Sequence, residues 1–444
     1  MDILISNATV VTMDNSMHLY LDGHVGITDG KITYISPNPP ADCQPKQIID
    51  GTGMVLMPGL INCHTHLPMT ILRGFADDMD LQTWLFDHIF PKEEKLDDRA
   101  VKAATLLGIA ECLQFGVTSV SEMYDHIDAI AQAVAESGIK ANISRGTTMF
   151  LGEDFDFETF PACQELVSAT KKWHNHDNGR IKIEAGVHAE YTSSHHFWDK
   201  IAEFAISEGL SMQVHLSETK SEHQSCEEKY GLTPAEILDC HHVFAVPTQA
   251  AHCVWLTEDD RALLAKRNVT AVHCPTSNLK LASGVADVMS MVKAGMNVAI
   301  GTDSACSNNN LDLFKEIRAA ALLAKEKSGD PAAVSAAAAL LMGTVCGARA
   351  QGRQAECGII AEDMDADLIL VDFTRPHLMP CHNVVSNLVY AANGSDVVMT
   401  MVRGNILYSA GKFHTIDMNA VVKELAEHAM PLLFAEAPKE ESHG

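Results

Sequence analysis

The two ends of the chain share an alternating apolar and polar pattern. Near the N-terminus the apolar positions fall in short runs that end around Val11, Ile27 and Ile35. The turn sequence Thr28-Asp29-Gly30-Lys31 separates the last two runs, as in a β-hairpin. A similar pattern returns in residues 366–371 and 397–404. It predicts short antiparallel strands at both ends of the chain, assembled into one small β-domain.

The middle of the chain has a different periodicity. Short β-branched runs alternate with helical stretches of roughly ten to twenty residues, which is typical of repeated βα units around a parallel sheet. Helices are predicted over 96–115 and 259–267, and again within 319–323 and 332–341. Eight strands are predicted to end near His64/His66, Glu122, Arg145, His188, His215, His252, His273 and Asp303. Eight such units indicate a TIM-type (β/α)8 barrel rather than an open sheet.

These patterns predict the order of domains. We expect residues 1–56 to form the first part of a small β-sandwich, residues 57–358 the barrel, and residues 359–416 the rest of the sandwich. Residues 417–444 are expected to form a C-terminal helix and tail, frayed from Pro438 to Gly444. The predicted fold class is α/β, a (β/α)8 barrel with a β-sandwich formed from both chain termini.

Composition narrows the class of protein. The 444 residues are 47% hydrophobic and 20% charged, as in globular proteins, and the formal net charge is −26. That charge argues against nucleic acids and anionic membranes as partners, because both would repel it. The twelve cysteines form no C-x-x-C pair, and neither a secretory pattern nor an apolar stretch of ~18–20 residues is present. We expect a cytoplasmic homo-oligomer with reduced cysteines that acts on a small molecule.

Ionisable side chains stand at the carboxyl ends of the predicted barrel strands. In a closed barrel these ends converge on one face, where barrel enzymes build their active sites. Strands that merely stop at polar residues would explain two or three such coincidences, but not eight in order. The sequence therefore predicts a functional site on this face.

Three segments suggest a metal site there. His64 and His66 are two residues apart, so on a strand both side chains face the same side. They follow the apolar run 55–61, which we expect to be the buried first barrel strand. His215 has Glu218 three residues later, which suits a ligand followed by a proton-transfer group, and Asp303 supplies a carboxylate ligand, a base or a helix N-cap.

Three histidines and one aspartate fit a catalytic zinc site that keeps one position open for water. Iron or manganese could occupy the same set, so the Zn²⁺ assignment leaves Fe²⁺ and Mn²⁺ open. A dinuclear site commonly needs a bridging acid or a modified lysine. The fourth strand ends at His188 instead, which favours one metal ion per subunit.

Several motifs resemble the amidohydrolase superfamily. The first-strand sequence at residues 57–66 is similar to that of the superfamily, and the likeness continues through residues 251–255, 273–284 and 301–303. The segments at residues 72–78, 84–85 and 91–93 resemble, more narrowly, the methylthioadenosine/S-adenosylhomocysteine deaminases. The likeness covers nearly the whole chain, including both β segments.

This resemblance implies a zinc-dependent hydrolytic deaminase that converts the adenine ring of a nucleoside to its hypoxanthine product and releases ammonia. Hydroxide formed at neutral pH would attack the ring. The implied metal ligands are His64, His66, His215 and Asp303. Glu218 would exchange protons with the purine, His252 would orient the water and Asp303 would accept its proton. The implied substrate contacts are Trp84, Glu93, Arg145, His188, Glu218 and Asp303.

Glu93 bears most on the substrate. A carboxylate can accept both hydrogens of a vicinal diol, so Glu93 favours a ribose, whereas its alternative role is a solvated charge on a helix. Arg145 could meet a homocysteine carboxylate. Ser304 and Glu190, beside the predicted site, depart from the commonest family pattern and leave the fine substrate preference open.

Two alternatives stay open at this point. One is a hydrolase of another amino- or chloro-substituted heterocycle, such as a triazine, guanine or a pterin. The other is a catalytically inactive assembly protein that kept the barrel. Cys63, Cys253 and Cys274 flank site histidines, and we expect them to face the helix layer because adjacent strand residues point to opposite sides.

Overall fold

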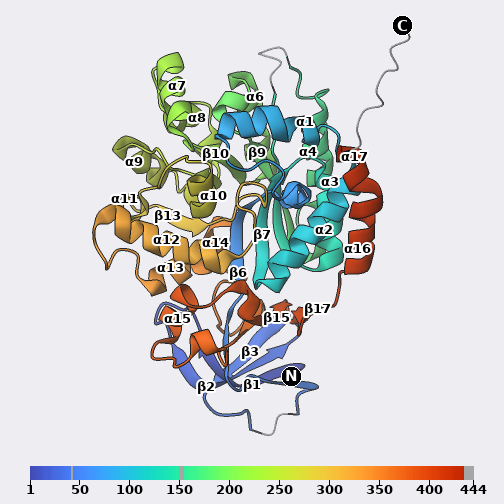
Figure 1. Ribbon diagram of the computed structural model, residues 1–444, viewed down its shortest axis with the longest axis vertical. Helices are drawn as coiled ribbons and strands as arrows, with labels where there is room; N and C mark the ends of the chain where they lie inside the picture. The colour runs from blue at the N-terminus through green and yellow to red at the C-terminus, as the bar shows by residue number, and fades with distance from the viewer. Residues whose placement is uncertain (42–43, 150–154, 435–444) are drawn as a thin grey trace.

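Two β-sheets organise the structure, a computed structural model that describes residues 1–41, 44–149 and 155–434. An eight-stranded parallel sheet forms the barrel, and a nine-stranded sheet below it forms a smaller domain (Figure 1). The predicted frayed tail at Pro438 to Gly444 lies outside the described residues. Among the residues that are described, no helix combines the length and the apolar character needed to cross a membrane.

The barrel strands are hydrogen-bonded in chain order. They are β6 (Leu60–Thr65), β7 (Val117–Tyr124), β8 (Lys140–Arg145), β9 (Ile181–Val187), β10 (Met212–Leu216), β11 (Thr248–His252), β12 (Thr270–His273) and β13 (Asn297–Ile300). Each ends at or within three residues of its predicted end. The prediction of a (β/α)8 barrel is therefore confirmed.

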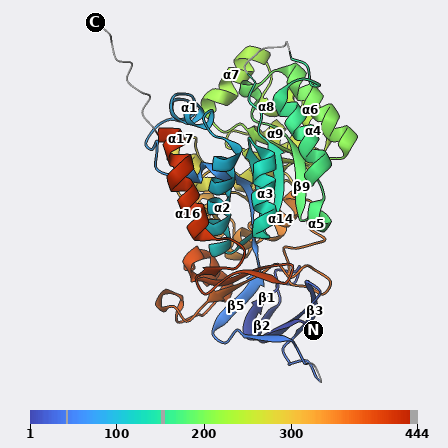
Figure 2. The same cartoon turned by 90° about the vertical axis from the view of Figure 1, so that its right-hand side faces the viewer.

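Helices surround this sheet. The main ones are α2 (Asp98–Gln114), α3 (Ile127–Ser137), α4 (Pro161–Trp173), α6 (His195–Glu208), α7 (Lys220–Tyr230), α8 (Pro234–Cys240), α9 (Glu258–Lys266), α11 (Val288–Lys293), α12 (Leu313–Ser328), α13 (Ala336–Met342) and α14 (Val345–Ala350). Helix α2 begins where the Asp97 side chain accepts a hydrogen bond from the backbone N–H of Ala100. The C-terminal helices α16 (Met418–Glu424) and α17 (Met430–Phe434) run along the outside of the barrel beside α2 (Figure 2).

The barrel closes where its first strand meets its last. The backbone N–H of Asp303 donates to the carbonyl of His64 at 3.0 Å. The Asn62 side chain adds two bonds to Thr302: Nδ2 donates to Oγ1 at 2.7 Å, and Oδ1 accepts from the backbone N–H at 3.0 Å. A Cβ on Gly301 would lie 2.7 Å from the Cβ of His64, so glycine permits this close approach. The seam thus brings together residues from opposite ends of the barrel sequence.

The smaller sheet combines both ends of the chain. Its N-terminal strands are β1 (Ile3–Val11), β2 (Leu19–Thr28), β3 (Lys31–Ser36), β4 (Gln47–Asp50) and β5 (Met54–Pro58), and its C-terminal strands are β14 (Leu368–Asp372), β15 (Val397–Val402), β16 (Asn405–Ser409) and β17 (Lys412–Phe413). Antiparallel pairing of β5 with β14 joins the two sets. The predicted hairpin turn at Asp29 and Gly30 has positive φ at both residues, 50° and 77°, as a type I′ turn requires.

Strand β14 shows why the two domains pack tightly. Leu368 and Leu370 lie in the core of the smaller domain, while Ile369 and Val371 lie in the barrel core. Successive side chains of a strand point to opposite faces, so one short strand contributes to both cores. The sheet therefore covers the amino-terminal end of the barrel, and the carboxyl ends of the barrel strands point away from it.

The apolar run at residues 55–61 was expected to be one barrel strand. This prediction is wrong, because the run contains parts of two strands. Residues up to Pro58 belong to β5 in the smaller sheet, and β6 begins at Leu60. A Cβ on the intervening Gly59 would lie 2.2 Å from the Thr118 side chain. Both strands are buried, so the apolar pattern runs through the break without marking it. The predicted boundary at residues 56/57 falls inside β5, and the division of the chain at residues 57, 359 and 417 stays a prediction.

Asn62→Ala tests the barrel seam. The variant leaves the buried N–H and hydroxyl of Thr302 without Asn62, so the free energy of unfolding should fall by about 1–3 kcal/mol. Chemical denaturation measures this. Gln132→Ala, which removes a half-buried amide that bonds Asp128 on the surface of α3, should cost less than about 0.5 kcal/mol. Equal losses for both variants would contradict a special role for the seam.

Candidate active site

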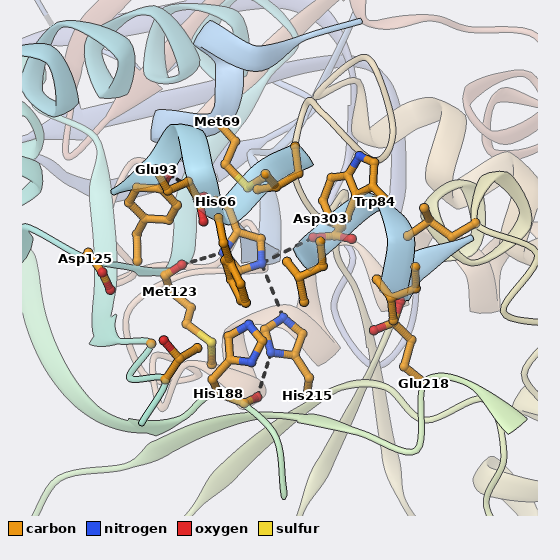
Figure 3. Close-up of a pocket in the computed structure, with 18 of the residues that line it drawn as sticks. His66, Met69, Trp84, Glu93, Met123, Asp125, His188, His215, Glu218 and Asp303 are labelled. Carbon is orange, nitrogen blue, oxygen red and sulfur yellow. Dashed lines mark hydrogen bonds and ion pairs between the residues drawn. The ribbon is translucent and has the colours of Figure 1, made fainter. Parts of the chain in front are cut away.

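A cavity of about 400 Å³ opens at the carboxyl end of the barrel strands. Its wall includes five of the six predicted substrate contacts, Trp84, Glu93, His188, Glu218 and Asp303, together with the predicted site residues His66, His215 and His252. Side chains from β6, β10 and the residues after β13 converge at its base (Figure 3). The convergence expected from the strand ends is thus present.

Three histidines form a compact cluster at the base. One ring nitrogen from each of His64, His66 and His215 lies within 4.8 Å of the others, and the Nε2 atoms of His66 and His215 are 3.3 Å apart. Asp303 adjoins them, with Oδ1 3.6 Å from Nε2 of His64 and 3.4 Å from Nε2 of His66. The Nε2 atom of His64 is buried and has no hydrogen-bond partner.

The histidines of the cluster are in the neutral form that can bind a cation. Burial lowers the pKa of His64, His66 and His215, which keeps the rings neutral. Nδ1 of His66 lies 2.5 Å from the Met123 carbonyl and Nδ1 of His215 lies 2.8 Å from the His188 carbonyl, which fixes the tautomer that donates from Nδ1. The Nε2 lone pairs are left facing one point. The donor set therefore fits a metal ion.

Asp303 is held as a carboxylate. Burial alone would raise its pKa, but the neighbouring histidines and the Ser277 hydroxyl outweigh burial and lower it. Oδ2 accepts from Oγ of Ser277 at 2.6 Å and from Oγ of Ser307 at 2.8 Å, while Oδ1 accepts from the backbone N–H of Ser304 at 2.7 Å. An anion so oriented beside three neutral imidazoles can complete an N₃O ligand set for a metal ion.

Glu218 and His252 lie beside the cluster. Nε2 of His252 is 3.7 Å from Oε2 of Glu218, and Nδ1 of His252 bonds Oδ1 of Asn278 at 2.8 Å. Burial raises the pKa of Glu218 to about 7, so this carboxyl can hold a proton near neutral pH. Sequence analysis missed Asn278, although the motif at residues 273–284 contains it.

The backbone is strained at these positions. Ser217, His252, Cys253 and Asp303 all have positive φ, between 47° and 70°. Non-glycine residues adopt this region uncommonly, and such residues cluster at functional sites. Two of these four residues, His252 and Asp303, line the cavity.

Two further buried carboxyl groups, those of Glu190 and Glu222, lie next to the segment that carries Glu218. Oε2 of Glu222, in the first turn of α7, accepts from the backbone N–H of Glu218 at 2.7 Å and of Thr219 at 3.1 Å. Glu190, buried after β9, shares a hydrogen bond with Glu222. Burial and repulsion from Glu222 raise the pKa of Glu190 well above its usual value, so Glu190 is the protonated partner. The unusual residue at position 190 thus contacts the segment that carries Glu218.

Glu93 lies at the other side of the cavity from Glu218 (Figure 3). A π-helical turn (Thr83–Ile89) places Trp84, and the next turn, α1 (Phe90–Glu93), places Glu93. The Tyr124 hydroxyl donates to Oε1 of Glu93 at 2.5 Å. Burial raises the pKa of Glu93 to about 7. Tyr124, two residues past the predicted strand end at Glu122, was missed by sequence analysis.

Arg145 is the one predicted substrate contact that does not line the cavity. Its Nε donates to Oε2 of Glu165 at 2.7 Å, and its Nη1 pairs with Asp125. Glu165 is in turn fixed by the backbone N–H of Ile127 at 2.6 Å. The guanidinium is therefore balanced by two carboxylates beside the cavity, and its contact with substrate stays a prediction.

Two of the three cysteines beside the site, Cys63 and Cys274, contact the helix layer as expected. Cys63 and Cys274 are buried in a cluster with Ala348 of α14, and Sγ of Cys63 lies 3.7 Å from the Gly347 carbonyl. Cys253 lies in the main barrel core. The prediction that these thiols face the helix layer is confirmed for Cys63 and Cys274.

Comparison with known proteins places this geometry in context. A model of the amidohydrolase family matches residues 55–407. The chain is 40% identical to a 5-methylthioadenosine/S-adenosylhomocysteine deaminase of Pelotomaculum thermopropionicum over 98% of this chain and 100% of that protein. It is 41% identical to a 5′-deoxyadenosine deaminase of Methanosarcina acetivorans, over 97% and 98% of the two chains. The crystal structure of an adenosine deaminase from Xanthomonas campestris with bound zinc matches with a TM-score of 0.90 and 32% identity, covering 97% and 98% of the two chains.

Glu190→Gln tests the buried carboxyl pair. Folded Glu190 keeps its proton at pH values where the unfolded chain, with a pKa of about 4.3, has lost it, so stability falls as pH rises. Glutamine keeps a donor for Glu222 without this cost. The variant should gain stability over the natural chain progressively from about pH 5 to pH 8, by at most about 1.4 kcal/mol per pH unit.

Denaturation curves across this pH range measure the effect. Glu203→Gln, which removes an exposed carboxylate paired with Lys200, provides the control and should run parallel to the natural chain. A Glu190→Gln curve that is also parallel would refute a protonated Glu190. Glu190→Leu, which removes the donor, should destabilise the fold at every pH.

Proposed function

The chain belongs to the amidohydrolase family, and we propose that it is a zinc-dependent hydrolase that deaminates the adenine ring of a 5′-substituted adenosine nucleoside. One observation carries this proposal: a single cavity is lined by His66, His215 and Asp303, with Glu218 on one side of these residues and the Glu93–Tyr124 pair on the other (Figure 3). The deaminase relatives, which match over nearly the full chain, support it.

In this proposal His64, His66, His215 and Asp303 hold one metal ion. The zinc in the related adenosine deaminase structure favours zinc over iron or manganese. Bound zinc would act as a Lewis acid and lower the pKa of a water molecule at the open position. The surrounding side chains would carry out the proton transfers and orient the water.

Asp303 accepts the proton of the attacking water, since Ser277 and Ser307 hold its carboxylate in place. His252, fixed by Asn278, orients the water oxygen toward the purine. Protonated Glu218 donates to the ring nitrogen next to the amino-bearing carbon, which makes that carbon electrophilic. The water oxygen bonds to the carbon, the amino group takes up the proton that Asp303 accepted, and the carbon–nitrogen bond breaks to release ammonia. The hydroxyl proton of the adduct passes to Glu218, so the product has a carbonyl at this carbon and keeps the proton on the ring nitrogen.

Glu93 distinguishes a nucleoside from a bare heterocycle. Its carboxyl lies across the cavity from Glu218. In this proposal a purine held at Glu218 extends its ribose toward Glu93. Oε1 already accepts from Tyr124, and the ionised group can also accept from the ribose hydroxyls. Hydrolysis of a triazine, guanine or a pterin would make no use of this group, so Glu93 favours the nucleoside.

Ammonia release from a panel of substrates tests the proposal. The zinc-loaded protein should deaminate methylthioadenosine, S-adenosylhomocysteine, 5′-deoxyadenosine or adenosine, but not free adenine. Glu93→Ala should lower kcat/KM for the nucleosides by about 10–100-fold, the value of hydrogen bonds to a charged group. Asp87→Ala, which changes an exposed side chain of the π-helical turn before α1, is the control and should retain kcat/KM.

If the protein released no ammonia from any of the nucleosides, the nucleoside assignment would be overturned, and triazines, guanine or pterins would be favoured as substrates. The alternative of an inactive assembly protein predicts no bound metal. Metal analysis of the purified protein decides that alternative independently of turnover.

Glu218→Gln separates proton transfer from metal binding. Glutamine keeps the shape of the side chain but cannot donate the acid proton, so kcat should fall by about 10²–10⁴. Metal content should stay near one ion per chain, because Glu218 is not a proposed ligand. Loss of metal, or turnover near that of the natural chain, would contradict the assignment of Glu218 as the acid.

A further inference from the structure

A buried carboxyl group near the end of β7 takes no part in the proposed reaction. Glu122 is fully buried and does not line the cavity, although the next two residues, Met123 and Tyr124, do. Burying a carboxyl group costs free energy unless hydrogen bonds compensate, so the bonds that Glu122 makes indicate its role.

Glu122 holds the segment that carries the two histidines at the end of β6. Its Oε2 accepts from Oγ1 of Thr65 at 2.6 Å and from the backbone N–H of Leu67 at 2.8 Å. Thr65 lies between His64 and His66, and Leu67 follows His66, so both bonds act on residues next to proposed metal ligands. Oε1 of Glu122 has no hydrogen-bond partner in the part of the chain that the structure describes. Both bonds thus depend on one oxygen atom.

The backbone ladder alone does not fix this segment. Asn62 of β6 lies opposite Val120 of β7, and Thr65 lies opposite Glu122, so β6 advances three residues while β7 advances two. An extra residue of this kind disrupts the ladder locally and changes the direction of the side chains. The Glu122 side chain supplies its bonds directly after this irregularity.

The next residue of β7 fixes the His66 ring. Nδ1 of His66 lies 2.5 Å from the Met123 carbonyl, a bond that Figure 3 shows. This bond aims Nε2 at the cluster only if the His66 backbone stays in register with β7. The bonds of Glu122 to Thr65 and Leu67 hold that backbone on both sides, so Glu122 and Met123 place His66 together.

We infer that Glu122 is a positioning residue that holds the segment from His64 to His66 in the geometry that binds the metal ion. This inference rests on the metal site of the proposed function. Glu122 acts on the ligands through Thr65 and Leu67. Removing a group that orients metal ligands typically lowers metal affinity by about 10–100-fold.

The zinc affinity of the full-length protein, measured by competition with a chelator of known affinity, tests the inference independently of turnover. Glu122→Met removes the acceptor oxygen at nearly constant side-chain volume, so the zinc dissociation constant should rise about 10–100-fold. Glu122→Gln keeps a carbonyl oxygen that can accept both hydrogen bonds, so this variant should recover most of the lost affinity.

Thr65→Val is a second, milder variant that decides the question if Glu122→Met does not fold. It removes one of the two bonds to Glu122 and should raise the zinc dissociation constant by a smaller factor. In the Glu122→Met background the same change should add little, because its partner is already absent and the two effects are then not additive.

Asp260→Leu is the matched control. Asp260, on α9, is also fully buried and accepts from one threonine hydroxyl, Oγ1 of Thr233 at 2.5 Å, and from one backbone N–H, that of Thr257 at 2.8 Å. The control should lower the denaturation midpoint of the metal-free protein, as Glu122→Met does, but should leave the zinc affinity unchanged.

The outcomes separate the inference from the proposed function. Zinc affinities of Glu122→Met and Thr65→Val equal to that of the natural chain would overturn the inference and leave the proposed function standing. An equal loss of affinity in Asp260→Leu would also overturn it, because lower stability alone would then explain the effect. Failure of the natural chain to bind zinc would count against the metal site of the proposed function itself.

Discussion

Closure of the barrel is the constraint on which the site depends. Asp303 and His64 are separated by most of the barrel sequence, and they become neighbours because the Asp303 backbone N–H bonds the His64 carbonyl across the seam. Gly301 and Asn62 allow and strengthen that contact. The proposed ligand set is therefore assembled by the same hydrogen bonds that complete the barrel. Its geometry is a property of the whole barrel, not of one loop.

Burial and local hydrogen bonds then set a different protonation state for each side chain of the site. Removal from water keeps the clustered histidines neutral, whereas hydrogen bonds and neighbouring imidazoles keep Asp303 ionised. The same burial raises the pKa values of Glu218 and Glu93 to about 7, because these groups have fewer compensating donors. One cavity thus contains bases that can bind a cation, an anion that can accept a proton and an acid that can give one.

The opposite end of the barrel serves stability. Lys140, fully buried at the start of β8, lies 2.8 Å from Asp365 and 2.6 Å from Asp367, which directly precede β14 of the smaller sheet. Its Nζ links the barrel to that sheet in an environment where removing one partner would leave a buried charge unpaired. Structural charges at the amino-terminal end and functional charges at the carboxyl end are thereby kept apart, as in other barrels of this type.

The periodicity of the chain by itself determined the eight strands and their polar ends, because burial on both faces and convergence at one edge leave a local pattern. Only the tertiary structure showed that residues 55–61 belong to two sheets, since two buried strands have the same apolar composition. It also decided that Arg145 pairs with Glu165 and Asp125, and that Glu190 lies against Glu222. The sequence alone does not show which residue a charged side chain pairs with. Pairing depends on distances between segments far apart in the chain, and folding alone sets those distances.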